Sequence, residues 1–415
     1  MAMHLFIDTN IYLSFYHHSK DDLESLEELM IEIVDKHIVL HLPQQVSEEI
    51  ERNRDVKLNT AVNEFKKISL NVAIPRHMLS MATAETYATA IADAKQARDH
   101  LIAQATAKAR LLELDVDVWL SFLYSLAKRH EHDDAIFARG KVRAERGNPP
   151  GKNGSLGDQY NWEMLLEKLP DTDLYIVSRD GDYMSAFEGS DSAVYPNAFL
   201  KREWATRKGG KALYVFETIK GVLDHYTKIL AKAEAPKEAD AKEKAGAQGP
   251  KKAKDQTEAH GTAAVKATSE LGDIQSSDMS KVLKIHFGSQ DEFKSELSKE
   301  QNDEKEAAIK ELEMSPNFAT THAVIKELQK FDGHFSTDEV NALFKTAVTN
   351  NQVGWIIEDD DVNKFYLGLV SSHTADADSD LVDAIIQKLK LSTDQESSGD
   401  GPQSDDSTWA DLLKP

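Results

Sequence analysis

The stretch HLFIDTN (residues 4–10) decides the fold of this chain together with LYIVSRDGDY (residues 174–183). In each stretch an uninterrupted apolar run, typical of a buried strand, leads directly into acidic residues. Asp8 ends the first run, and Asp180 and Asp182 follow the second. In open α/β sheets, ligands gather outside the carboxyl ends of the strands. The two stretches therefore predict a group of carboxylates at one edge of a buried sheet.

Strand-like and helix-like segments alternate up to about residue 233, which predicts an α/β fold with a central parallel sheet. The periodicity of residues 80–128 predicts helix almost throughout, as part of a long helical insertion at about 57–138. A basic loop rich in Gly and Pro is expected at 138–157, and the run RHEHDD (129–134) is expected to be a solvated helix end. Predicted strands occupy residues 4–8, 38–42, 174–178 and 212–219, and predicted helices include 21–36, the segment after Pro43 and a last one to 233.

The composition changes after residue 233. Residues 234–272 are rich in Ala, Lys, Glu, Gly and Pro, which predicts a flexible linker. A mainly helical domain is expected at 273–392, where Ser336 and Glu339 form a capping-box pattern. The acidic tail at 393–415 is predicted to be disordered. Within the tail, a short docking motif is expected to consist of Trp409, Leu412 and Leu413.

Length and composition exclude several classes of protein. The 415 residues suit two or three domains, and the lack of cysteine excludes disulfides, thiolate zinc sites and cysteine nucleophiles. Neither a signal peptide nor an apolar run of about 20 residues is recognisable, so we expect a cytoplasmic protein without a membrane segment. The formal charge of −22 argues against sequence-blind coating of nucleic acid. It leaves room for an enzyme that holds a nucleic acid through local patches.

Helical geometry selects two further acidic residues. At 100° per residue, Glu49 lies about 60° from Val46 on the buried face of its helix, whereas Glu48 points toward solvent. Asp158 lies within about 40° of the apolar stripe of the next helix, in its first turn. A buried carboxylate needs a metal, a basic partner or a helix N-terminus to offset its charge. A simple capping role for Asp158 is the alternative.

Several carboxylates at one place favour a specific chemistry. Hard divalent cations such as Mg²⁺ and Mn²⁺ prefer oxygen ligands, and three to five carboxylates can hold one or two ions. Such ions activate water and stabilise charge on a phosphodiester during in-line attack. No Ser, His or Cys nucleophile is then required.

The N-terminal 230 residues resemble the PIN-domain nuclease superfamily, through FIDTN, the helix VSEEI, the helix start GDQYNWEML and IVSRDGDY in this order. The resemblance implies a three-layer α/β fold and a metal-dependent ribonuclease. It implies an acidic quartet that consists of Asp8, Glu49, Asp158 and Asp180, with Asp182 as an auxiliary metal ligand and Thr9, Asn10 and Ser178 in support. Residues 55–150 depart from the family pattern, which leaves the substrate class open.

Two groups of basic residues could hold phosphates beside the acidic positions. The first lies in the predicted basic loop, where a solvated loop is the alternative; it comprises Arg139, Lys141, Arg143, Arg146 and Lys152. The second surrounds Trp204, which could stack on a base but is better explained by packing under a surface loop.

Two classes of function compete. The first is a metal-dependent endoribonuclease, for which DNA is the alternative substrate. Enzymes of the PIN superfamily often serve as toxins, defence effectors or RNA-processing factors. The second is a non-catalytic scaffold that binds RNA or protein. In either case the C-terminal domain is expected to recruit a protein partner or regulator, and the helical insertion could mediate homo-oligomerisation. The complete acidic set favours the enzyme.

Overall fold

The structure is a computed structural model that describes residues 2–17, 23–70, 73–151, 156–186, 193–229 and 297–391. The chain divides into two compact units. The first contains Met1–Ser69 and Leu114–Phe293, and the second contains Leu70–Glu113 and Lys294–Pro415. The predicted linker, the predicted acidic tail and Lys152 lie outside the described residues.

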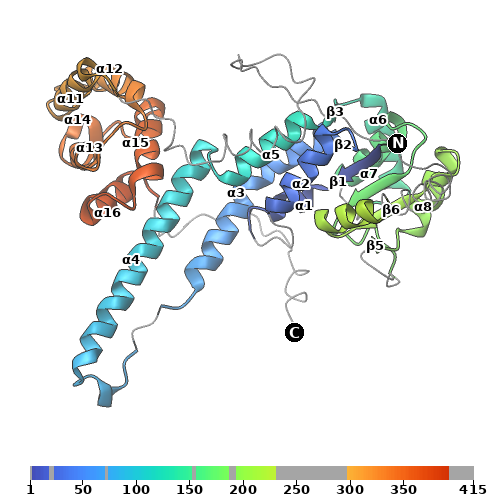
Figure 1. The fold of residues 1–415 in the computed structure, drawn as a ribbon, viewed down its shortest axis with the longest axis horizontal. Helices are drawn as coiled ribbons and strands as arrows, with labels where there is room; N and C mark the ends of the chain where they lie inside the picture. The colour runs from blue at the N-terminus through green and yellow to red at the C-terminus, as the bar shows by residue number, and fades with distance from the viewer. Residues whose placement is uncertain are drawn as a thin grey trace, which may run out of the picture. The chain divides into compact units, whose positions relative to one another are not determined.

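A six-stranded sheet in the order β3-β2-β1-β4-β6-β5 forms the centre of the first unit. Five neighbouring strands are parallel, and the short β5 joins the edge of β6 antiparallel. The predicted α/β fold with a central parallel sheet flanked by helices is thus confirmed (Figure 1). The strands are β1 (Met3–Ile7), β2 (Ile38–Pro43), β3 (Lys128–His130), β4 (Leu174–Val177), β5 (Ala193–Val194) and β6 (Leu213–Phe216).

Helices connect the strands of this unit. They are α1 (Thr9–Ser14), α2 (Leu23–Val34), α3 (Gln44–Lys67), α5 (Asp115–Leu126), α6 (Asp134–Glu145), α7 (Gly157–Lys168) and α8 (Ala198–Arg207), and residues 219–229 are also helical. Strands β1 and β4 are apolar and buried along their whole length or nearly so, because parallel strands in a layered fold are covered on both faces. Trp162 of α7 and Trp204 of α8 are fully buried and pack against each other. Trp204 is therefore a core residue, which agrees with the prediction that it packs inside the protein and does not stack on a base.

Three histidines form a row across neighbouring strands of the sheet. His4 Nδ1 and His41 Nε2 are 2.9 Å apart, and His41 Nδ1 and His130 Nε2 are 2.8 Å apart, so the rings share two hydrogen bonds. Burial, with His130 and His4 nearby, lowers the pKa of His41 to about 3, and burial with Lys128 nearby lowers that of His130 to about 4. The row is therefore neutral at pH 7.

The second unit is entirely helical in its described residues. Its helices are η1 (Arg76–Met78), α4 (Ala82–Leu111), α11 (Lys299–Glu313), α12 (Phe318–Leu328), η3 (Gln329–Phe331), α13 (Thr337–Thr349), α14 (Asn351–Gly354), α15 (Asp360–His373) and α16 (Ser379–Lys388). Ser336 and Glu339 form the predicted capping box at the start of α13. Ala103 and Ala107 of α4 are buried in the same core as the apolar faces of α11 to α16.

The unit boundaries differ from the domain boundaries expected at the sequence level. Residues 57–138 were expected to form one insertion in the first domain, but α4 packs with α15 and α16 of the second unit. Leu112, with a φ of 60°, ends α4, so the helix predicted at 80–128 is two helices. The reason is compositional: the small side chains of α4 allow close packing against the C-terminal helices but give no signal about which helices they contact.

Two local predictions were wrong. Residues 129–134 do not end a helix, because β3 pairs with β2 at Lys128, Arg129 and His130, and Asp133 then caps α6. The predicted loop at 138–157 is helical as far as Glu145, because the capped helix runs through it. Within the described part of the chain, no helix combines the length and apolar character needed to cross a membrane.

Candidate metal centre

Asp8 follows β1 directly, at the carboxyl edge of the sheet. Its backbone N–H donates to the carbonyl of Val177 at 2.9 Å, which aligns the ends of β1 and β4. The side chain is only 4% exposed. Its carboxylate accepts hydrogen bonds from the Thr9 backbone N–H at 2.8 Å, Asn10 Nδ2 at 2.8 Å and Ser178 Oγ at 2.7 Å. A polar turn after each of two adjacent strands thus fixes Asp8 in place.

The surroundings of Asp8 oppose its negative charge. Burial, followed by repulsion from Asp158 and more weakly from Glu49, raises its pKa from 3.8 to about 8, although the Ser178 and Thr9 hydrogen bonds act the other way. Three carboxylates from β1, α3 and α7 therefore lie close enough to influence one another. A cation among them would relieve the repulsion that the bare site retains.

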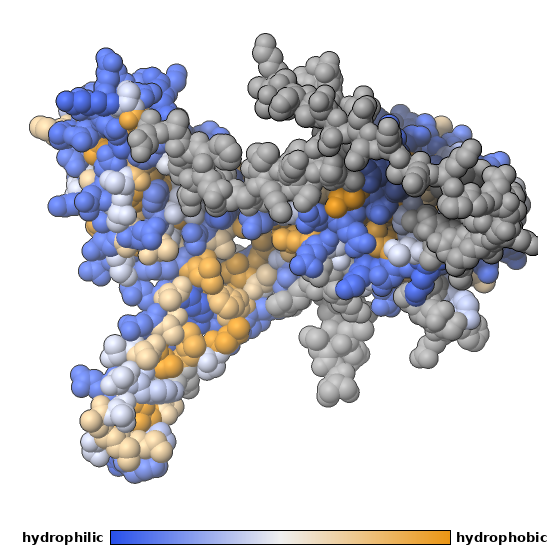
Figure 2. Space-filling view, viewed as in Figure 1, coloured by the Kyte–Doolittle hydropathy of each residue, from blue (hydrophilic) through white to orange (hydrophobic). Residues whose placement is uncertain are grey.

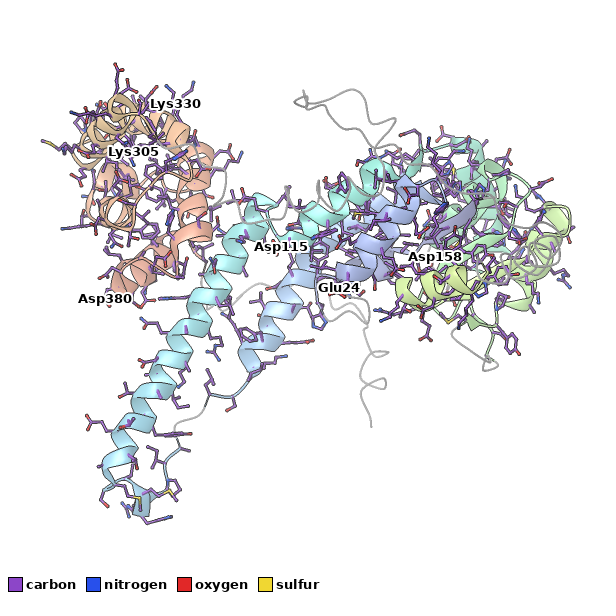
Figure 3. The ribbon with its side chains drawn as sticks, viewed as in Figure 1. Glu24, Asp115, Asp158, Lys305, Lys330 and Asp380 are labelled. Atoms are coloured by element: carbon purple, nitrogen blue, oxygen red, sulfur yellow. The ribbon has the colours of Figure 1, made fainter. Side chains whose placement is uncertain are left out.

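Asp158, Asp180 and Asp182 form a group that could hold a metal ion. One carboxylate oxygen from each lies within 4.8 Å of the others, and all three side chains are half-buried. Asp158 lies in the first turn of α7, one position after the first residue Gly157, so it is not the capping residue (Figure 3). The loop after β4 is ordered by hydrogen bonds from the Asp180 backbone N–H to Ser178 Oγ at 3.0 Å and from the Asp182 N–H to Asp180 Oδ1 at 3.2 Å.

Glu49 approaches the same place from α3. Thr9 Oγ1 donates to Glu49 Oε2 at 3.3 Å, and a Cβ atom added at Gly157 would lie 3.5 Å from that oxygen. Burial raises the pKa of Glu49. Glu48, in contrast, hydrogen-bonds His132 at 3.0 Å on the surface. Glu49 therefore lies beside the start of α7.

Tyr183 was not singled out in the sequence, although it follows Asp182 directly. Its side chain is 1% exposed, and its hydroxyl has no hydrogen-bond partner among the described residues. Burial and the charges of Asp8, Asp158 and others raise its pKa well above 10, so the hydroxyl keeps its proton. A sequence gives no measure of whether a buried hydroxyl has a hydrogen-bond partner, so no signal in it identifies Tyr183.

The residues present fit a divalent cation. The donors are carboxylate oxygens, which hard cations prefer, and they come from α7 and the loop after β4. Burial, and then repulsion from Asp158 and Glu49, raises the pKa of Asp8, and a cation beside these carboxylates would balance their charge. Within the described residues, Asp158, Asp180 and Asp182 are the group whose geometry suits a metal. Asp8 and Glu49 adjoin this group rather than complete it.

The basic residues predicted to hold nucleic acid do not form one surface. Arg143 is 4% exposed; it donates to Glu163 Oε1 at 2.8 Å and also pairs with Glu203. Its expected role in binding phosphates is thus wrong, because the guanidinium neutralises two carboxylates inside the unit. Arg139 pairs with Glu167 at 3.0 Å, and Lys141 lies over the ring of Phe137 at 4.7 Å. Arg146 follows the end of α6 and is exposed.

Comparison with known proteins supports the resemblance to PIN domains. Residues 5–183 match the family model of the PIN domain. The matched region runs from β1 to the loop that carries Asp180 and Asp182, and it includes Glu49 and Asp158. No curated protein and no solved structure matched the chain. The N-terminal region is therefore a PIN domain, a member of a nuclease superfamily whose domains generally use divalent metal ions.

Proposed function

We propose that this PIN-domain protein is a metal-dependent endoribonuclease. The observation that carries the proposal is a set of neighbouring carboxylates: burial, Asp158 and Glu49 raise the pKa of Asp8 to about 8, and Asp158 also groups with Asp180 and Asp182. A fold does not retain an uncompensated group of this kind for stability, because burying charges together is costly. Perturbed carboxylates at the ligand edge of an α/β sheet support a catalytic site.

The chain's own residues divide into ligands and supports. Asp8, Glu49, Asp158 and Asp180 would hold one or two Mg²⁺ or Mn²⁺ ions, with Asp182 as a further ligand, and the ions would activate water and offset charge on the phosphodiester. Ser178 and Asn10 orient Asp8 through hydrogen bonds at 2.7 and 2.8 Å. Thr9 orients Glu49. Ligands fixed in this way need little reorganisation when the substrate arrives.

RNA is the substrate we propose, with DNA as the competing choice. Arg146, which is exposed after α6, and the surface side chain of Lys141 support binding of the phosphate backbone. The paired Arg139 contributes less, because its guanidinium is already shared with Glu167 and Glu163. We further propose that the helical C-terminal module recruits a protein partner, since Trp355 is 69% exposed there and contacts Phe318. Exposed tryptophans are enriched at the centres of protein interfaces.

A cleavage assay tests the proposed function. Full-length protein is incubated with single-stranded RNA, structured RNA and single-stranded DNA in Mg²⁺, Mn²⁺ or EDTA. Wild type, Asp158→Asn and the exposed control Asp115→Asn are compared. We expect metal-dependent cleavage of RNA by the wild type and the control, and a loss of at least about a hundredfold in Asp158→Asn.

The outcomes separate the candidate functions. Cleavage of DNA in preference to RNA would correct the substrate. Binding of RNA without cleavage, by protein whose circular dichroism shows it to be folded, would favour the non-catalytic scaffold. Equal activity of Asp158→Asn and wild type would remove this carboxylate from the catalytic centre.

A further inference from the structure

An apolar pocket lies on the second unit where the chain enters α4. Its volume is about 430 Å³, and Ile74, Pro75, Met78, Met81 and Tyr87 contribute to its lining. Met81 and Tyr87 are about half exposed, at 53% and 49%. Apolar and near-neutral residues continue along this end of α4 (Figure 2). Pockets of this size commonly bind ligands, and flexible methionines adapt to the shape of an apolar side chain.

We propose that the C-terminal segment of the same chain docks in this pocket through Trp409, Leu412 and Leu413. The segment reads DDSTWADLLKP, and its three large apolar residues have the spacing i, i+3 and i+4. In a helix this spacing places all three on one face, which is how an amphipathic segment enters an apolar groove. The proposal concerns the second unit and does not depend on nuclease activity.

The chain is long enough to make this contact within one molecule. Arg110, near the end of α4, donates to the carbonyls of Leu389 and Lys390 at 3.1 Å, so the segment after 391 starts beside this residue. The 23 residues from Arg110 back to Tyr87 span about 35 Å of helix. The 18 residues from 391 to Trp409 can extend over about 60 Å. The motif can therefore reach the pocket along α4.

Charge distinguishes this pocket from the exposed apolar patch around Trp355 and Phe318. Residues 392–415 contain six acidic residues and one lysine, and residues 73–111 contain five basic and three acidic residues. The other patch, around Trp355 and Phe318, belongs to residues 297–391, which contain 18 acidic residues and nine lysines. Around the pocket itself, residues 73–87 contain one arginine and one glutamate, so an acidic segment meets no net charge there, whereas the second surface repels it.

Peptide competition in the full-length chain tests the proposal. A fluorescein-labelled peptide of residues 400–415 is titrated into wild type and into a tail variant carrying Trp409→Ala, Leu412→Ala and Leu413→Ala. Fluorescence anisotropy reports binding. We expect the peptide to bind the tail variant and to bind wild type at least about tenfold more weakly, since a tethered tail competes at an effective concentration near the millimolar range.

Two substitutions in the tail variant locate the binding site. Met81→Asp should abolish peptide binding, and Trp355→Ala should leave it unchanged; both side chains are exposed, so folding should tolerate the changes. Failure of the peptide to bind the tail variant would overturn the proposal, as would binding that depends on Trp355. A wild-type dimer that the tail variant dissociates, measured by light scattering, would also overturn it, because the tail would then dock between copies.

Discussion

Replacing Asp8 with asparagine is expected to stabilise the PIN domain while abolishing the proposed nuclease activity. Burial raises the pKa of Asp8 from 3.8 to about 8, so the folded state takes up a proton that the unfolded state has released. A carboxyl group with a raised pKa contributes its full stability only below its unfolded pKa of 3.8. That stability is lost as the pH rises toward the folded pKa of about 8. The loss is about 1.4 kcal/mol per pH unit, or about 4 kcal/mol by pH 7. Asparagine carries no charge and removes this loss.

Lost hydrogen bonds offset part of the gain. Asn10 Nδ2 and Ser178 Oγ both donate to Asp8 Oδ2, and an amide group in its place would meet them with its own N–H groups. The serine hydroxyl can rotate to accept, so we count about one lost hydrogen bond, worth about 1–2 kcal/mol. Asp8→Asn should therefore be about 2–3 kcal/mol more stable than wild type at pH 7. It should be about 1–2 kcal/mol less stable at pH 4, with equality near pH 5.

Urea unfolding followed by tryptophan fluorescence measures this difference. Trp119, Trp162 and Trp204 are buried in the first unit, whereas Trp355 in the second is already 69% exposed, so the signal reports mainly the PIN domain. Midpoints are measured in EDTA from pH 4 to 8 for wild type, Asp8→Asn and the control Asp115→Asn. In Mn²⁺ at about 100 times its Kd, wild type should gain about 2.7 kcal/mol and the Asp8 variant much less.

Two results would refute this reasoning. If wild type and Asp8→Asn lose stability in parallel between pH 5 and 7, the carboxylate does not carry the proposed proton uptake. If Asp8→Asn is less stable at every pH, the hydrogen bonds of Asp8 matter more than its charge, and the residue is structural.

Three further predictions concern buried polar groups of the PIN domain. Tyr183→Phe should leave the urea midpoint unchanged or raise it, since the hydroxyl has no partner among the described residues, whereas Tyr160→Phe should cost about 1 kcal/mol through the hydroxyl's lost bond to a backbone N–H. Arg143→Ala should lower stability by about 3–5 kcal/mol in urea unfolding, because two glutamates lose their partner inside the unit. In the Asp8→Asn variant, stability should fall as pH drops below 6.5, because the pKa values of His41 and His130 in the folded protein are lowered to about 3 and 4. Adding His130→Asn to that variant should make the pH dependence of the urea midpoint shallower.

The central sheet and the proximity of the acidic residues to one another could be predicted, because both follow from patterns of neighbouring residues in the sequence. An apolar run followed by Asp8, and another followed by Asp180, place both at the carboxyl edge once the strands are parallel. The hydrogen bond of Glu49 to Thr9 agrees with the helical geometry that favoured it over Glu48. Parallel order in the sheet, rather than any single motif, brings these positions together.

Long-range pairing could not be predicted in the same way. Arg143 reads as a surface cation in a basic stretch, and only the packing of α6, α7 and α8 brings Glu163 and Glu203 to its guanidinium. The histidine row depends likewise on strand register, because His41 and His130 become neighbours only when β3 pairs with β2. Periodicity identifies a buried face but not the element that covers it.

The carboxylate centre is costly for the PIN domain to maintain without a cation. The raised pKa of Asp8 corresponds to about 4 kcal/mol at pH 7, which is a large part of the 5–15 kcal/mol that typically stabilises a domain. Serine and asparagine hydrogen bonds hold the carboxylate in this position instead of letting it turn to solvent. An energetically unfavourable group that the surrounding structure holds in place indicates a functional site. A bound cation would reverse the sign of this contribution, so the same residues should couple metal binding to the stability of the fold.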